Sequence, residues 1–488
     1  MKVLILTEGG KNIGFGHLTR CLSVCQAFEK RGILPEFVVN GDKTVEEFLK
    51  NKKCKNFNWL KEKDRLLASI EGVDTVIIDS YLASFEFYKK VSELVKIPVY
   101  IDDNKRLDYP KGVVVNGAIY AEEINYHQKR DITYLLGPKY LPLRKEFWNV
   151  TEKEIRDEIE SILITFGGND AKNMTLKVIA MLIECFPKIV KNVVIGKGFK
   201  NVKEIEKYKN GKTNLIYYPN AEEIKNVMFE SDVAISSGGV TLYELARVGV
   251  PTISIAVADN QLNNVKRLAE KGFIEYAGWM EDKNLLDHLL EKLELLKNKD
   301  LRKEKAKIGK TMVDGSGAVK IASFCIKKYL ERGLVLREAD VRDTYSIYSL
   351  SNEPDVRQSS FNTEKIELES HKKWFIDRLK DKNCLFLVGE INNNFLGQIR
   401  FNLNRDEAVI SISVRNKYRG LGRGSIFIRK SLDYLKLKNP NIKKVKAYIK
   451  EKNFSSMKFF ERSNFHFENK TIVNGHNALE YSHEFGRK

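Results

Sequence analysis

Ile13-Gly14-Phe15-Gly16-His17 lies where an apolar stretch, Lys2 to Thr7, gives way to a segment with helical spacing. The pattern predicts a β-strand, a glycine loop and then a helix. Glycines at positions 14 and 16 permit positive φ angles and a close approach of a ligand to the backbone. A helix that begins after such a loop offers free N–H groups and the positive end of its dipole, which suit a phosphate or a developing anion. His17 can exchange a proton near neutral pH, although a histidine that merely caps the helix fits the pattern equally well.

The length and composition are those of a multidomain globular protein. The chain has 488 residues, of which 43% are hydrophobic and 30% charged. One core does not extend over such a length, so two or three domains are expected. No apolar run approaches the roughly 20 residues of a membrane span. The N-terminal apolar run is too short for a signal peptide and lacks a small-residue cleavage site. These features predict a cytoplasmic location and no membrane partner.

The net charge of +18 permits binding to nucleic acid or to polyanionic small molecules. The lysines are spread along exposed helix faces, as at Lys172, Lys177 and 303–310. No arginine-rich arm, zinc-finger spacing or aromatic RNA-binding signature is present in the sequence. Nucleic acid is therefore not expected as a partner and is kept as a minor alternative.

The six cysteines are scattered over the chain and form no disulfide framework. Cys21 and Cys25 are one helical turn apart and share an apolar face with Leu18, Leu22 and Phe28. This placement favours core packing over a metal site, and no metal is expected.

Up to about residue 330, short apolar strands alternate with amphipathic helices, a pattern typical of parallel sheets covered on both faces. The expected strands are Lys2 to Thr7, Glu36 to Asn40, Thr75 to Asp79, Val99 to Asp103, Val113 to Asn116, Ser161 to Phe166, Asn192 to Ile195, Leu215 to Tyr218, Val233 to Ser236 and Thr252 to Ala256. A charged stretch, Asn149 to Glu160, divides the region, and Gly167-Gly168 then follows a fresh strand. We therefore expect two Rossmann-like halves, residues 1–148 and 149–332, with ligands at the carboxyl ends of the strands.

From about Gly333 the pattern predicts a separate α+β domain, residues 333–488. The expected elements are a strand Val335 to Arg337, two helical stretches through Tyr348 and through Trp374, strands Leu385 to Ile391, Phe395 to Asn402 and Ala408 to Val414, a helix Gly424 to Leu437, a strand Val445 to Ile449, a short helix Ser455 to Arg462 and closing strands from Phe465 onward.

A second dense signature lies in the second half of the first region. Ser236-Ser237-Gly238-Gly239-Val240-Thr241-Leu242-Tyr243-Glu244 follows a strand and opens a helix, and Gly249-Val250-Pro251 leads to the next strand. Glycines at a helix N-terminus can hold a diphosphate with backbone N–H groups. Glu244 is placed to bind the vicinal hydroxyls of a ribose, and Gln261 can bind sugar hydroxyls or a phosphate. Packing glycines and a surface acid are the alternative, which the clustering of polar residues at strand ends disfavours.

These residues resemble the nucleotide-sugar site of GT-B glycosyltransferases, and the first 330 residues more specifically resemble the UDP-sugar hydrolases of pseudaminic acid biosynthesis. The matching motifs are Ile13-Gly14-Phe15-Gly16-His17, Ile77-Ile78-Asp79-Ser80-Tyr81, Ile101-Asp102-Asp103, Asn116 with Ala118 and Tyr120, Leu143-Arg144-Glu146-Phe147 and Phe166-Gly167-Gly168-Asn169-Asp170. The resemblance implies an α/β fold with a GT-B-like pair of Rossmann-like domains. It also implies attack of water on the anomeric carbon of UDP-2,4-diacetamido-2,4,6-trideoxy-β-L-altropyranose, which releases UDP and the free sugar.

Residues expected to act in this site follow from the same motifs. His17 is expected to be the base for water, with glycine loops and helix N-termini stabilising the diphosphate without a metal. The residues expected to bind the UDP-sugar are Gly14, Gly16, Asp79, Tyr81, Asn116, Gly167, Gly168, Asn169, Ser237, Gly238, Gly239, Glu244, Gln261 and Asn264. Members of the family often have an Arg-x-Asp pair after the first strand, where this chain has Leu6 and Glu8. The way in which the sugar is held is therefore open.

The last domain has its own signature, Arg419-Gly420-Leu421-Gly422-Arg423-Gly424, between a strand and a helix. It resembles the pyrophosphate loop of GNAT acetyltransferases, in which successive N–H groups bind coenzyme A. Asn453-Phe454-Ser455-Ser456 and the Phe459 to Phe465 segment resemble the second coenzyme-binding segment of that family. The resemblance implies a splayed strand before the loop and acetyl-CoA as cosubstrate. The residues expected to bind it are Ile412, Val414, Arg419, Gly420, Leu421, Gly422, Arg423, Gly424, Ser425, Asn453, Ser456 and Phe460.

The acid and base of the acetyl transfer do not follow from the motifs. Phe460 stands where many GNAT enzymes have a tyrosine general acid, so Tyr448 or water is expected to take that role. Glu390 and Glu407 are candidate bases for the amine, and each fits a solvated strand residue equally well.

Together the two resemblances imply consecutive reactions on one chain. The last domain would acetylate a UDP-4-amino-4,6-dideoxy sugar, and the first region would hydrolyse the product. The alternatives are a GT-B glycosyltransferase fused to an acetyltransferase, and a non-catalytic regulator that binds nucleotide sugars. The configuration of the sugar is left open, because related nonulosonic acid pathways use similar enzymes on stereoisomers. No oligomeric state follows from the sequence.

Overall fold

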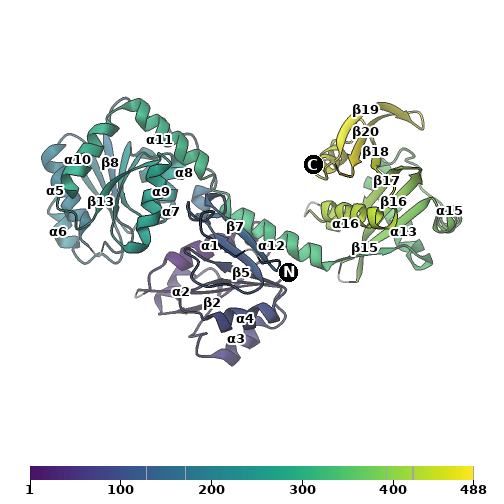
Figure 1. The fold of residues 1–488 in the computed structure, drawn as a ribbon, viewed down its shortest axis with the longest axis horizontal. Helices are drawn as coiled ribbons and strands as arrows, with labels where there is room; N and C mark the ends of the chain where they lie inside the picture. Colours follow the sequence, from purple (N-terminus) through teal and green to yellow (C-terminus); the bar gives the residue numbers. More distant parts are fainter. Residues whose placement is uncertain (12, 128, 171, 392, 420–421, 487–488) are drawn as a thin grey trace. The chain divides into compact units, whose positions relative to one another are not determined.

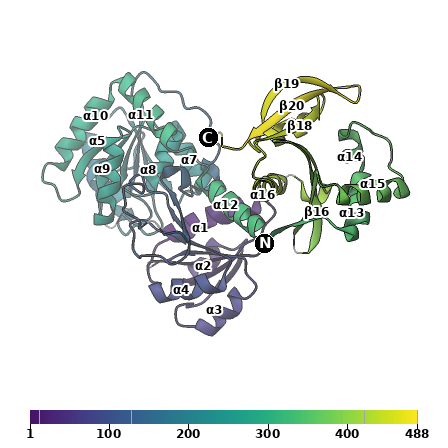
Figure 2. The ribbon, with the colours of Figure 1, turned by 45° about the vertical axis from the view of Figure 1, so that its right-hand side comes forward.

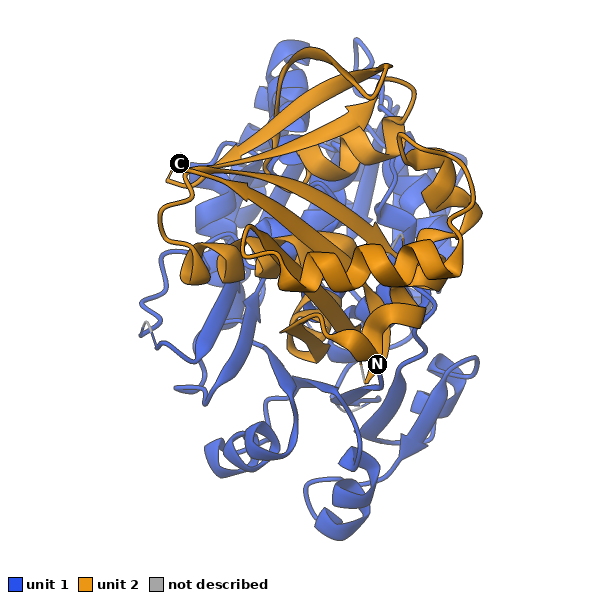
Figure 3. Ribbon diagram, turned by 90° about the vertical axis from the view of Figure 1, so that its right-hand side faces the viewer, with its two compact units in different colours: residues 1–325 blue, residues 326–488 orange. Residues whose placement is uncertain are grey.

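The chain divides into two compact units, unit 1 (Met1–Cys325) and unit 2 (Ile326–Lys488), which are coloured separately in Figure 3. The computed structural model describes residues 1–11, 13–127, 129–170, 172–391, 393–419 and 422–486 (Figure 1). Unit 1 contains two parallel sheets, and unit 2 contains one mostly antiparallel sheet. Within the described ranges, no helix has the length and apolar character needed to cross a bilayer.

The first sheet of unit 1 has seven parallel strands in the order β3-β2-β1-β4-β5-β6-β7. The strands are β1 (Val3–Gly9), β2 (Glu36–Gly41), β3 (Lys53–Asn56), β4 (Thr75–Asp79), β5 (Ile97–Ile101), β6 (Gly112–Asn116) and β7 (Ile132–Leu136). The helices are α1 (Gly16–Glu29), α2 (Thr44–Phe48), α3 (Lys63–Ile70) and α4 (Phe85–Leu94). From β1 the next strands, β2 and β3, are added on one side, and from β4 onward they are added on the other side. The place where the strand order reverses, between β1 and β4, is called the switch point, and ligands of open parallel sheets bind there.

The second sheet repeats this design with six parallel strands in the order β10-β9-β8-β11-β12-β13. The strands are β8 (Ser161–Thr165), β9 (Val190–Ile195), β10 (Thr213–Tyr217), β11 (Val233–Ser237), β12 (Thr252–Ala256) and β13 (Ile274–Trp279). The helices are α5 (Met174–Cys185), α6 (Val202–Glu206), α7 (Ala221–Glu230), α8 (Thr241–Val248), α9 (Leu262–Glu270), α10 (Leu285–Leu296) and α11 (Lys299–Met312), and α12 (Gly317–Gly333) follows. Its switch point lies between β8 and β11.

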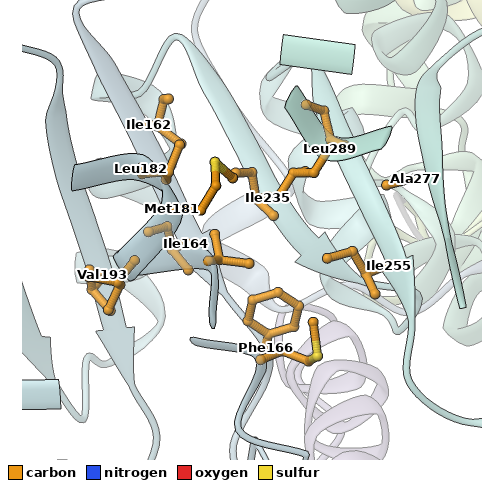
Figure 4. Close-up of a cluster of buried hydrophobic side chains, with 14 of the residues drawn as sticks. Ile162, Ile164, Phe166, Met181, Leu182, Val193, Ile235, Ile255, Ala277 and Leu289 are labelled. Carbon is orange, nitrogen blue, oxygen red and sulfur yellow. The ribbon is translucent and has the colours of Figure 1, made fainter. Parts of the chain in front are cut away.

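The central strands of the second sheet are mostly apolar because helices cover both faces. Ile162 and Ile164 of β8 pack with Met181 and Leu182 of α5 in one cluster (Figure 4), whereas Leu163 belongs to the cluster on the opposite face. Side chains alternate between the faces of a strand, so consecutive apolar residues fill both cores. Full burial of each such side chain contributes about 1.5–3 kcal/mol to the free energy of folding, relative to an exposed side chain.

The sheet of unit 2 has the order β14-β15-β16-β17-β18-β20-β19, antiparallel except between β17 and β18. The strands are β14 (Leu334–Glu338), β15 (Cys384–Ile391), β16 (Asn394–Asn404), β17 (Glu407–Val414), β18 (Lys444–Lys450), β19 (His466–Val473) and β20 (His476–Glu484). The helices are α13 (Thr344–Ser351), α14 (Pro354–Ser359), α15 (Leu368–Lys380), α16 (Arg423–Lys438) and α17 (Phe454–Glu461). Helix α16 lies on one side of this sheet, and α13 and α15 lie on the other (Figure 2). Their buried residues accordingly belong to different core clusters.

The predicted strands are all present, and the predicted α/β and α+β architecture is confirmed. Three strands that the sequence analysis did not predict, β3, β7 and β13, each lie at an edge of a sheet. The predicted strand Val99 to Asp103 ends at Ile101 instead, because the Asp102 carboxylate accepts the N–H groups of Lys105 (2.7 Å) and Arg106 (3.1 Å) in the loop that follows.

Candidate active sites

His17 and Asp79 meet at the switch point of the first sheet. His17 lies in the first turn of α1, and Asp79 ends β4, which pairs with β1. Nδ1 of His17 lies 2.6 Å from Oδ1 of Asp79. The Asp79 side chain is fully buried, whereas 11% of the His17 side chain is exposed. The sequence motifs that contain these residues are far apart in the chain, and the sheet brings them together.

The charge of Asp79 favours a proton on Nδ1 of His17. Burial disfavours the ionised carboxyl group, but Arg20 and His17 outweigh burial and lower the pKa of Asp79 to about 2. The carboxylate is therefore ionised at neutral pH and faces Nδ1 as an acceptor. Nη2 of Arg20, which can only donate, also lies 3.1 Å from Nδ1. In the neutral ring the lone pair is then on Nε2. No hydrogen-bond partner of Nε2 is found among the described residues, and the role of His17 as a base stays a prediction.

Arg20 holds two carboxylates beside His17. Its Nε and Nη2 donate to the two oxygens of Asp79 at 2.5 and 2.7 Å, and its Nη1 donates to Oδ1 of Asp103 at 2.7 Å. Sequence reasoning missed both Arg20 and Asp103 as site residues. The spacing of His17 and Arg20 places them on one helical face, and this was the available signal.

Tyr81 completes this cluster. Its hydroxyl donates to Oδ2 of Asp103, and its ring meets the ring of His17 edge-on with centroids 4.6 Å apart. Burial and the Asp103 charge raise the pKa of Tyr81, so the phenol stays protonated. The tyrosine is 47% exposed and can reach a ligand.

Glu8 has a defined role at the position where the family often has aspartate. Its carboxylate is buried and accepts the Tyr81 N–H at 2.7 Å and the Ser80 hydroxyl at 2.8 Å. Glu8 thus fixes the segment after β4 that places Tyr81 against His17.

The first glycine loop is closed by paired backbone hydrogen bonds between Gly10 and Gly14, of 3.1 and 2.7 Å. Gly14 has a φ of +91°, which favours glycine, whereas Gly16 begins α1 without a positive φ. Among the described residues, and apart from the adjoining backbone, no atom lies within 4 Å of a Cβ built on either glycine, so a ligand can approach both positions.

Asn116 lies at the end of β6, buried, and its side chain is engaged within the protein. Nδ2 donates to the Asp103 carbonyl and the Tyr126 hydroxyl, both at 3.0 Å, and Oδ1 accepts the Ala118 N–H at 2.9 Å. Asn116 therefore positions the Asp103 segment, and direct contact with substrate stays a prediction.

The switch point of the second sheet presents two glycine loops. Gly167, Gly168 and Asn169 follow β8, and the last two of these are exposed. Gly238 and Gly239 follow β11, where Ser237 is buried. The N–H groups of Gly239, Val240 and Thr241 have no hydrogen-bond acceptor in the described part of the chain. These amides at the start of α8 are the available donors for a diphosphate.

Gln261 and Asn264 hold the Gly238 loop. Oε1 of Gln261 accepts the Gly238 N–H at 3.1 Å, and Nδ2 of Asn264 donates to the Gly238 carbonyl at 2.8 Å. Both polar groups of Gly238 are thus occupied, which leaves its neighbours to bind a ligand.

Glu244 forms a bidentate ion pair with Arg144. Nε and Nη2 of Arg144 each donate to one carboxylate oxygen at 2.7 Å, and the Glu244 side chain is buried. The alternative interpretation of Glu244 as a surface acid is therefore wrong, because the side chain is buried. Ribose binding by Glu244 stays a prediction, and it would use lone pairs that Arg144 leaves free.

In unit 2 the strand before the glycine loop separates from its neighbour. β17 pairs with β18 only from Glu407 to Val409, so the stretch that contains Ile412 and Val414 is unpaired on that side. The splay implied by the GNAT resemblance is therefore present. It leaves backbone groups free to bind an extended ligand.

The loop itself contains Gly422, which has a φ of +73° at the N-cap of α16, with open space around its Cβ position. Gly420 and Leu421 lie outside the described residues. Arg419 donates from Nε to the Val414 carbonyl at 2.8 Å, and the Arg423 guanidinium lies over the Tyr418 ring. A Cβ on Gly424 would approach the Phe459 ring to 2.9 Å, and Ser425 follows, half-buried, in the first turn of α16.

The remaining predicted residues of unit 2 have internal contacts. Asn453 caps α17 by accepting the Ser456 N–H at 3.1 Å. Phe460 is buried against Phe459 and Phe465.

Of the candidate acid and bases, Tyr448 is half-buried, and burial together with Glu480 raises its pKa. Glu390 is paired with Arg337 at 2.7 Å, and Glu407 with Lys446 at 2.6 Å. Each carboxylate is thus held by a neighbouring cation. Within the described ranges, no group of three or more His, Cys, Asp or Glu side chains could hold a metal ion.

Comparison with known proteins defines the class of each unit. Residues 161–319 match the glycosyltransferase family 28 C-terminal domain, and residues 343–465 match the acetyltransferase (GNAT) family. The predicted fold class, a GT-B-like pair of Rossmann-like domains followed by an α+β domain of the GNAT fold, is confirmed.

Three curated relatives narrow this class. An uncharacterized protein of Methanocaldococcus jannaschii is 26% identical over 95% of this chain and 96% of its own length. A Helicobacter pylori protein named pseudaminic acid cytidylyltransferase and UDP-2,4-diacetamido-2,4,6-trideoxy-beta-L-altropyranose hydrolase is 28% identical over 56% of this chain, and the match spans 48% of that protein. A Campylobacter jejuni protein named UDP-2,4-diacetamido-2,4,6-trideoxy-beta-L-altropyranose hydrolase is 24% identical over 57% of this chain and 99% of its own length. The predicted resemblance to this hydrolase group, joined to a GNAT enzyme, is confirmed.

Proposed function

We propose that the chain is a bifunctional enzyme that acetylates a UDP-4-amino-4,6-dideoxy sugar and hydrolyses UDP-2,4-diacetamido-2,4,6-trideoxy-β-L-altropyranose to UDP and the free sugar. The single observation that supports the hydrolase most is the His17–Asp79 pair at a switch point, with Nε2 of His17 unpartnered among the described residues. The names of the relatives supply the substrate class.

In the hydrolytic step, Nε2 of His17 accepts a proton from water as the water oxygen bonds to the anomeric carbon. The bond between that carbon and the diphosphate oxygen breaks, and its electron pair leaves with UDP. Asp79 stabilises the imidazolium that forms, and Arg20 keeps Asp79 in place.

The diphosphate gains negative charge as it leaves. The free N–H groups of Gly239, Val240 and Thr241, together with the dipole of α8, stabilise that charge. We propose that this arrangement needs no metal ion.

In the acetyl transfer, the substrate amine attacks the thioester carbonyl carbon. The new C–N bond replaces the C–S bond, the thiolate takes a proton from Tyr448 or water, and the amine releases a proton to water or to a carboxylate. The open edge of β17 and the N-terminus of α16 would hold acetyl-CoA.

The test is to incubate the purified chain with the UDP-4-amino sugar and acetyl-CoA and to identify the products by NMR. We expect His17→Ala to abolish UDP release while acetyl transfer continues. His288→Ala, a half-exposed histidine on α10, is the matched control and should leave both activities unchanged. UDP release that persists without His17 would contradict its role as base, and no release from the wild-type chain would contradict the hydrolase.

One observation favours a second candidate, a GT-B glycosyltransferase, because residues 161–319 match a glycosyltransferase domain. Addition of acceptor sugars distinguishes the two. A transferase would release UDP only with an acceptor and would form a glycoside, whereas the hydrolase releases UDP in water alone.

A further inference from the structure

Tyr243 of α8 connects the two halves of unit 1 through its hydroxyl group. The side chain is buried, with 3% of the residue exposed. Its hydroxyl accepts the Ile119 N–H at 2.9 Å from the first half and donates to Oδ1 of Asn264 at 2.5 Å in the second half. Burial raises the pKa of Tyr243, so the hydroxyl keeps the proton that this donation needs.

The connection continues to the loop that offers amides to a diphosphate. Asn264 uses its other end, Nδ2, to hold the Gly238 carbonyl at 2.8 Å. Because Gln261 holds the Gly238 N–H, the peptide groups on both sides of Gly238 are fixed. The direction of the next N–H groups, from Gly239 to Thr241, follows from that anchorage.

On the other side the connection leads to His17. Ile119 belongs to the segment after β6, in which Asn116 binds the Ala118 N–H and the Asp103 carbonyl. The Asp103 carboxylate in turn binds Arg20, which binds Asp79 beside His17. The proposed base and the diphosphate loop are thus connected by hydrogen bonds and the short stretches of backbone between them, and Tyr243 is where this path crosses between the halves.

We propose that Tyr243 is a positioning residue that sets the separation between the diphosphate loop of the second half and the base of the first. This inference rests on the proposed hydrolase function and deepens it. In-line attack requires water on His17 and the leaving diphosphate to be held on opposite sides of one carbon atom. An error of about 1 Å in such an arrangement costs on the order of 100-fold in rate.

A variant that lacks only the Tyr243 hydroxyl tests the connection between the two halves, because it keeps the aromatic ring. In Tyr243→Phe the packing of the aromatic ring is kept, but the Ile119 N–H and the side-chain Oδ1 of Asn264 lose their common partner. Unpaired buried groups are unfavourable, so the two loops are expected to move apart until each finds water or another partner.

The experiment uses the full chain and measures kcat for UDP release, the dissociation constant of UDP and the rate of acetyl transfer. For Tyr243→Phe we expect kcat to fall about 10- to 100-fold, with UDP affinity and acetyl transfer unchanged. Tyr100→Phe is the matched control, because Tyr100 also donates a buried hydroxyl hydrogen bond, to the Lys111 carbonyl at 2.9 Å, away from this network. It should lower thermal stability by a similar amount without changing kcat.

Asn264→Ala and the double variant show whether the two residues act as one link. If they do, the double variant is no slower than the slower single variant, because effects within one unit are not additive. The proposal would be overturned if the losses of kcat in the two single variants multiply in the double variant. It would also be overturned if kcat is unchanged in Tyr243→Phe, or if Tyr100→Phe loses as much kcat as Tyr243→Phe. A wild-type chain that releases no UDP would overturn the hydrolase function itself, and the positioning role with it.

Discussion

At the scale of single residues, the proposed role of His17 as a base depends on the charge of Asp79. Asp79→Asn keeps the shape of the side chain but removes the charge and can turn an N–H toward Nδ1, which favours the wrong tautomer of the ring. We expect UDP release to fall by roughly 10²- to 10⁴-fold, as when other His–carboxylate pairs lose the orienting charge. The measurement is steady-state UDP release, with UDP binding as the check that the site is intact.

The control for this variant is Asp131→Asn, which makes the same chemical change at an exposed loop position of unit 1. It should leave the rate unchanged. A rate in Asp79→Asn equal to that of the wild type would show that the carboxylate does not orient His17.

The Asp79 carboxylate also makes the free energy of unfolding of unit 1 depend on pH. Its folded-state pKa of about 2 lies below the ordinary value of 3.8, so the ionised group stabilises unit 1 at pH values above 3.8. That contribution is lost as the pH falls from 3.8 through about 2. Asp79→Asn should therefore lower the urea midpoint of unit 1 at neutral pH, and the difference from wild type should shrink over this window. A difference that stays constant with pH would contradict the assignment.

At the scale of elements, the N-terminus of α16 depends on one backbone conformation. Gly422 has a φ of +73°, which a β-branched residue adopts only with strain. Gly422→Val should rotate the loop amides away from the pyrophosphate and raise the KM for acetyl-CoA by about tenfold or more. UDP release from an acetylated substrate should be unchanged, because unit 1 contains all residues of the proposed hydrolase.

Gly475→Val is the matched control, since Gly475 has a φ of +77° and equally open surroundings in the turn between β19 and β20. It should cost stability but leave the KM for acetyl-CoA unchanged. A rise in KM for both variants would indicate general destabilisation of unit 2 instead of a local effect on the loop.

The elements also show what the sequence can and cannot predict. Central strands such as β8 and β11 were predicted because burial on both faces requires continuous apolar residues. β3, with the sequence Lys53-Cys54-Lys55-Asn56, was missed because an edge strand is partly solvated and lacks that signal. The glycine loops were predicted from the motifs that follow central strands.

Side-chain partners in the site were only partly predictable. His17 and Asp79 belong to separate motifs, and either could be chosen from its position after a strand. The partners of Arg20, Glu8 and Tyr243 depend on which strands become neighbours, and a single sequence does not contain that information. Tyr243 lies on a regular helix, where nothing in the local pattern distinguishes it from a core residue. For Arg20 the local pattern offers only its helical spacing from His17.

At the scale of the whole molecule, each unit contains a complete candidate site. The residues proposed for hydrolysis all lie within Met1–Cys325, and those proposed for acetyl transfer within Ile326–Lys488. A relative from M. jannaschii matches this chain across both units, so the combination is not peculiar to one sequence. The amide that one unit would form is part of the substrate that the other would cleave.

This arrangement predicts the products of defective chains. With the UDP-4-amino sugar and acetyl-CoA, His17→Ala should accumulate the acetylated UDP-sugar, because the intermediate is formed and not cleaved. Gly422→Val at low acetyl-CoA should leave the amino sugar largely unreacted. An equimolar mixture of the two variants should restore UDP formation, since the acetylated UDP-sugar can diffuse from one chain to another. The measurement is an NMR time course of all three samples, with the wild-type chain as reference. Failure of the mixture, when each variant retains its one remaining activity, would show that the intermediate has to stay on a single chain.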